Sequence, residues 1–150
     1  MAITFTNYFK TVLEALRDVI QSETNLPVYT DPEFETRATQ YFNLTPISSS
    51  LLNQYNKGEN REYEIEIRYY LRRGAYEKHK VLDYTTAMAE RIIRLFNKKD
   101  NAGFTTLTSS DFNEGVIQEV NYQPDRTPEE EDEEINIVEF AFVGRVTESY

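Results

Sequence analysis

The stretch EYEIEIRYYLRR, residues 62–73, alternates apolar and polar side chains with a period of two. Successive residues of a strand point to opposite faces of a sheet, so this period predicts a strand with one buried face. The expected buried set is Tyr63, Ile65, Ile67, Tyr69 and Leu71. The expected outer set is Glu64, Glu66, Arg68, Tyr70 and Arg72. It is the clearest strand signal in the chain.

An amphipathic helix is predicted ahead of this strand, because apolar residues recur there at helical spacing. They are Phe9, Val12, Leu13, Leu16, Val19 and Ile20. Thr6 or Asn7 is placed to accept the first free backbone amides as an N-cap. The helix should end near Thr24 and Asn25, because Leu26 precedes Pro27 and is biased away from helical angles.

The helical period returns after Gly74, in YEKHKVLDYTTAMAERIIRLFNKKD, residues 76–100, which predicts a long second helix. Further strands are expected at residues 27–31, at about 39–45, at 116–122 and at 135–149. The order is therefore helix, strands, long helix, strands. We predict one α+β domain over residues 1–150, with a mainly antiparallel sheet and with the N-terminal helix and the long central helix packed on one face.

Six consecutive acids precede the last predicted strand, in TPEEEDEEINIVEF, residues 127–140. They are Glu129, Glu130, Glu131, Asp132, Glu133 and Glu134. The net charge of the chain is −10, so this run supplies more than half of it. Contiguous like charges repel and stay extended, and an EF-hand would space its ligands around a glycine. We interpret the run as a solvated hairpin loop, which either guards the apolar strand beside it or projects toward a partner.

Few residues are available for catalysis. Cysteine is absent, and the single histidine, His79, lies among charged residues at the start of the second helix, without a nucleophile motif. The five glycines form no phosphate-binding loop. One histidine and no cysteine do not fill a usual zinc ligand set. No catalytic residue, metal ligand or cofactor is therefore assigned, and we expect the protein not to be an enzyme.

A magnesium site is the one catalytic alternative that the residues keep open. Glu64, Glu66 and Arg68 share a strand face, faintly like the acid-and-base strand of metal-dependent nucleases. Such nucleases also need a lysine there and an aspartate from a neighbouring strand. An ion-paired outer face is the favoured interpretation, because charges pair across the strands of a sheet.

The chain also lacks signals for export or for a membrane. MAITFTNYFK has no pattern of a secretion signal, and no window approaches eighteen apolar residues. We expect a soluble protein that stays where it is synthesised. The acidic balance argues against a free nucleic-acid binder, which would show a basic patch or stripe.

The order of these segments resembles the small tail terminator, or tail-completion, proteins of tailed bacteriophages. The resemblance covers nearly the entire chain: a first helix, LPVYTDPEF at 26–34, REYEIEIRYYLRR at 61–73 before a long helix, and GVIQEVNY at 115–122, with the acidic loop before INIVEFAFVGRVTES at 135–149. It implies a virion structural protein that forms a hexameric ring on the head-proximal end of the tail tube. The ring stops polymerisation of the tube, and of the sheath in contractile phages.

The resemblance also implies partners and a location. The partners are the tail tube protein, the sheath protein in contractile phages, and the neck or connector proteins. DNA passes through the ring without specific binding, and the protein resides in the virion after assembly in the host cytoplasm. The candidate contacts between subunits or with partners are Glu64, Glu66, Arg68, Tyr70, Arg72, Arg73 and the acidic loop. Another neck adaptor, a small metal-dependent nuclease and a ligand-binding α+β module are the alternatives.

Overall fold

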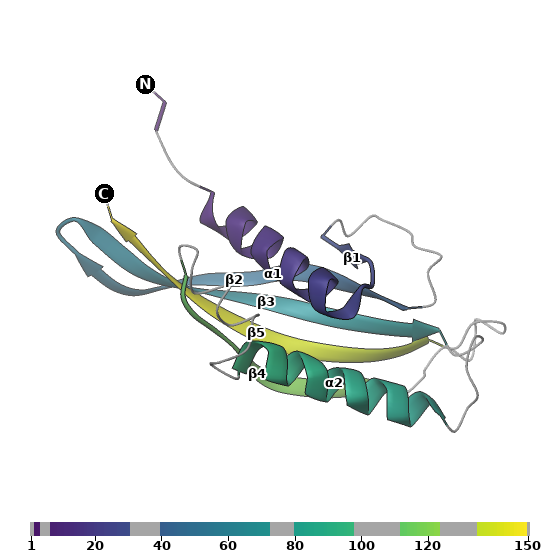
Figure 1. The fold of residues 1–150 in the computed structure, drawn as a ribbon. Helices are drawn as coiled ribbons and strands as arrows, with labels where there is room; N and C mark the ends of the chain where they lie inside the picture. The colour runs from purple at the N-terminus through teal and green to yellow at the C-terminus, as the bar shows by residue number, and fades with distance from the viewer. Residues whose placement is uncertain are drawn as a thin grey trace.

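A computed structural model describes residues 2–3, 7–30, 40–72, 80–97, 112–123 and 135–149 (Figure 1). Two helices and five strands make up this part of the chain. They are α1 (Tyr8–Thr24), β1 (Val28–Tyr29), β2 (Gln40–Tyr55), β3 (Gly58–Arg72), α2 (Val81–Asn97), β4 (Phe112–Gln123) and β5 (Ile135–Ser149). The strands form one sheet in the order β1-β2-β3-β5-β4.

The structure is α+β, but the predicted arrangement of a mainly antiparallel sheet with a long central helix is wrong. The sheet is mixed, because β1 runs parallel to β2. The second helix is not long, since α2 and α1 each have 17 residues. Nor is it central, since α2 lies over β4 and β5 at one side of the sheet (Figure 1). Helical periodicity marks an apolar face but carries no information about which strands that face will cover.

The ends of α1 follow from two asparagines. The side chain of Asn7 accepts a hydrogen bond from the Lys10 amide at 3.2 Å, which satisfies one of the free donors of the first turn. Asn25 adopts the left-handed conformation at φ 56° and donates its amide to the Gln21 carbonyl at 2.8 Å. Asparagine tolerates this conformation better than most residues. The predicted N-cap at Asn7 and the predicted end near Asn25 are confirmed.

The alternation predicted for β3 is confirmed. Tyr63, Ile65, Ile67, Tyr69 and Leu71 are buried, and the last four are fully enclosed. The three central residues, Ile65, Ile67 and Tyr69, lie beside apolar residues of both neighbouring strands: Ile67, for example, pairs with Leu44 on β2 and with Phe140 on β5. This face and the apolar faces of α1 and α2 form a single hydrophobic core.

The strand predicted at about 39–45 is much longer than expected. β2 continues to Tyr55 and pairs with β3 over its whole length, from Gln40 opposite Leu71 to Tyr55 opposite Gly58. Every residue of 46–55 is exposed, and the hairpin projects past the start of α1 (Figure 1). A strand with solvent on both faces has no reason to alternate apolar and polar residues, so the period-two signal is missing there.

The packing of β3 predicts where stability resides. Ile67→Ala should lower the free energy of unfolding by about 2–5 kcal/mol, because it leaves a cavity at the fully buried centre of the core. Ser50→Ala, in the exposed part of β2, should change it by less than about 0.5 kcal/mol. Urea unfolding followed by circular dichroism measures both. Equal losses in the two variants would contradict the assignment of the core to this face.

Candidate interaction surface

The face of the sheet opposite the core is not covered by either helix. Glu64, Glu66, Arg68 and Tyr70, the sequence-predicted contact residues of β3, all lie on this open face, and each is partly exposed. Arg72 ends β3, but its side chain lies outside the described structure. Arg73 and the acidic loop of Glu129–Glu134 also lie outside the described residues.

Arg68 is the centre of a charge cluster on the open face. Its guanidinium contacts Glu66 on the same strand, and Nη2 lies 3.4 Å from Oε1 of Glu139, directly opposite on β5. Partial burial lowers the pKa of Arg68, but a hydrogen bond with Tyr70 and the charge of Glu66 outweigh this effect and hold the pKa above its ordinary value. The arginine is thus charged at any physiological pH, and the ion-paired outer face expected from the sequence is present.

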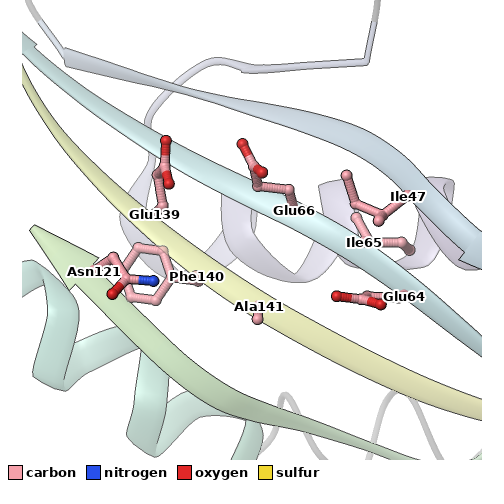
Figure 2. Close-up of a pocket in the computed structure, with 8 residues that line it drawn as sticks. All are labelled: Ile47, Glu64, Ile65, Glu66, Asn121, Glu139, Phe140 and Ala141. Atoms are coloured by element: carbon pink, nitrogen blue, oxygen red, sulfur yellow. The ribbon is translucent and has the colours of Figure 1, made fainter. Parts of the chain in front are cut away.

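A shallow hollow of about 110 Å³ lies beside this cluster, above the small side chain of Ala141 (Figure 2). Its lining includes Ile47, Glu64, Glu66, Glu139 and Asn121. The Glu64 carboxylate points toward Ala141 in Figure 2 and accepts a hydrogen bond from the Ser48 hydroxyl at 3.2 Å. Within the described ranges, no three acids or histidines are grouped in a way that would hold a metal ion.

Aromatic side chains cross the open face toward the end of β3. Tyr70 stacks on Tyr41 of β2, with ring centres 4.6 Å apart and planes 8° from parallel. Tyr41 in turn meets Tyr29 of β1 edge to face at 6.1 Å. Offset and edge-to-face contacts are the favoured arrangements of aromatic rings. Of these three tyrosines, sequence reasoning singled out Tyr70, because the register that brings the other two beside it is visible only in the sheet.

Beyond the short strand β1, no described segment pairs with the outer edge of β2. β1 pairs only with Phe42 and Asn43, and no other described strand lies against this edge. Residues 46–55, PISSSLLNQY, carry no charge. Four large apolar side chains in this stretch are 44–51% exposed: Ile47, Leu51, Leu52 and Tyr55. Edge strands of soluble proteins usually carry charges that prevent pairing with other chains, and here only Pro46 and two irregularities of register interrupt the strand.

The opposite edge of the sheet, along β4, is closed at one position by a helix side chain. The Asn97 amide at the end of α2 donates to the Ile117 carbonyl at 2.9 Å, and the Ile117 amide donates to Oδ1 of Asn97 at 2.7 Å. A strand residue directs both backbone groups to one side, so those of Ile117 point away from β5. Asn97 thus occupies the place that a neighbouring strand would take.

Comparison with known proteins names no function. No protein-family model matches the chain, and no curated protein matches it in sequence. One solved structure is similar over 98% of this chain and 99% of its own, with 12% sequence identity and a TM-score of 0.48, and its name describes no function. Neither described helix is long and apolar enough to cross a membrane.

The Arg68 cluster predicts a small, salt-sensitive contribution to stability. Arg68→Met should lower the free energy of unfolding by up to about 1 kcal/mol, because the arginine is 41% exposed and solvent screens its two ion pairs. The loss should shrink in 1 M salt. Lys10→Met, which removes the more exposed pair with Glu14, is the control and should have a smaller effect. Urea unfolding at two salt concentrations measures both. A loss that is unchanged by salt would contradict an electrostatic origin.

Proposed function

We propose that the protein is a virion structural protein without enzymatic activity: a tail terminator that forms a homo-hexameric ring on the head-proximal end of a phage tail tube. The observation that carries the proposal is the uncovered edge of β2, a projecting strand without charges and with four exposed apolar side chains. Such an edge pairs readily with another strand, so a protein that must remain soluble has to cover it. A closed ring covers it in every copy.

Ring formation needs two different contact patches on each subunit, since a head-to-tail interface repeats around an axis. The sheet offers such a pair, because the part of β2 beyond β1 on one side and β4 on the other differ in sequence and in the groups that cover them. One part of each edge is closed, by β1 on one side and by Asn97 on the other. This difference favours a directional contact over a symmetric one.

The charges on the open face support the proposal that this face lines the channel through which DNA passes. Glu62, Glu64, Glu66 and Glu139 are partly exposed there, opposed by Arg68 and Arg145. With a net charge of −10, a lumen lined by this face would repel phosphates and let DNA slide without counterion-release binding. The remaining surfaces of the ring would contact the tail tube, the sheath in contractile phages and the neck proteins. The protein would act in the virion, after assembly in the host cytoplasm.

The proposal is tested by mass and shape in solution. Light-scattering chromatography and electron microscopy of the purified protein should show closed six-fold rings, either alone or after incubation with tail tubes. The tubes should stop growing once they are capped. Bovine serum albumin in place of the protein is the control for tube growth. Monomers under both conditions, with tubes that continue to grow, would contradict the terminator function.

A further inference from the structure

We infer that the free edge of β2 is completed by strand β4 of a second copy, in a head-to-tail contact that displaces successive copies along their strands. The regular run of β2 from Ser48 to Leu51, between its two irregularities, is the receiving segment. The stretch from Glu119 to Gln123 of β4 is the incoming one. This contact rests on the proposed ring and names the surfaces that build it.

A strand of another chain fits this edge chemically. Added strands bind through their backbone groups, and the side chains beside them supply specificity. The edge of β2 offers these backbone groups along a stretch that ends at two exposed leucines, Leu51 and Leu52. It offers no cation for a nucleic acid, because residues 46–55 are uncharged.

The second copy is the partner that charge favours. Two molecules with a net charge of −10 repel each other over most of their surfaces. An uncharged strand is where that repulsion is weakest, so residues 46–55 are the place where a second acidic copy can approach. In a ring of identical subunits, every such edge then meets the same partner strand.

The contact on the second copy lies on β4, because β4 is the outer strand on the other side of the sheet. Asn97 closes this edge at Ile117. Past that point Asn121 and Tyr122 are both exposed, and Tyr122 is the one large apolar side chain among the described residues of β4 that is strongly exposed. This stretch of β4 thus offers an aromatic ring to the leucines of β2.

The register of the sheet fixes how the copies are offset. The row of Thr45, Glu66, Ala141 and Glu119 crosses all four long strands. The part of β2 from Pro46 onward lies on one side of this row, whereas the stretch of β4 from Val120 to Gln123 lies on the other. When these two segments pair, the next copy is displaced along the strand direction. A sheet that closes on itself requires such a stagger.

Engineered cysteines test this contact cleanly, because the chain has none of its own. Ser50 and Asn121 are exposed, and their registers with Glu62 and Glu139 place both on the open face. A disulfide forms only when the two Cα atoms lie within about 7 Å. Under mild oxidation, the Ser50→Cys, Asn121→Cys double variant should give a ladder of covalent multimers up to the ring. Ser48→Cys with Asn121→Cys covers a shift of two residues.

Each outcome of the cysteine experiment distinguishes one arrangement of neighbouring copies from another. Covalent dimers of Ser50→Cys alone would show that two β2 strands pair about a twofold axis and would overturn the head-to-tail contact. Linkage of Ser48→Cys to Val116→Cys instead would overturn the stagger, because Val116 lies level with Ser48 in the sheet. Rings without linkage in any pair would overturn the contact and leave the terminator function standing. Linked open chains that never close would support the contact and contradict that function.

A charge on the receiving edge is the second test. Leu51→Lys should abolish oligomers on light scattering, because it adds a charge where the incoming strand packs. Leu82→Lys on α2, where the leucine is 67% exposed, is the matched control and should leave oligomers intact. Circular dichroism confirms that both variants fold. Oligomers of unchanged size in folded Leu51→Lys would overturn the proposal.

Discussion

The structure depends on one constraint, the two-residue alternation of β3 at the centre of the sheet. Because β2 and β5 both pair with β3 along its length, the direction of its side chains fixes the face of its neighbours as well. A shift by one residue would turn Ile65, Ile67 and Tyr69 toward solvent and carry carboxylates into the core. Burial of this face against both helices therefore also determines which residues form the open face.

The sequence predicted the elements whose signals are local. The alternation of β3 and the asparagines at the ends of α1 depend only on neighbouring residues, and the structure bears them out. The parallel pairing of β1 and the position of α2 beside β4 depend on residues far apart in the chain, and the sequence carried no mark of either. The second half of β2 was missed for a different reason, since solvent on both of its faces removes any pattern.

The features of the candidate surface also fall into two groups: those that the local sequence predicts and those that depend on how the strands and helices pack. The alternating period of β3 identifies its outer residues, and the mixed charges among them predict ion pairing on that face. The partner Glu139 on β5 follows only from the register between the strands. The stacked Tyr29 and Tyr41, the hollow over Ala141 and the closure of β4 each require the register between strands or the docking of a helix. Asn97 reads in the sequence as an ordinary polar residue at the end of a helix.

That asparagine makes the edge of a sheet depend on the end of a helix. Helix termini open and close locally far more often than whole domains unfold. Because both backbone groups of Ile117 bond to Asn97, fraying of the last turn of α2 releases them together. Hydrogen exchange at the Ile117 amide is therefore set by the motion of α2, although the amide belongs to β4. The accessibility of this edge of the sheet therefore varies with the motion of a helix packed beside it.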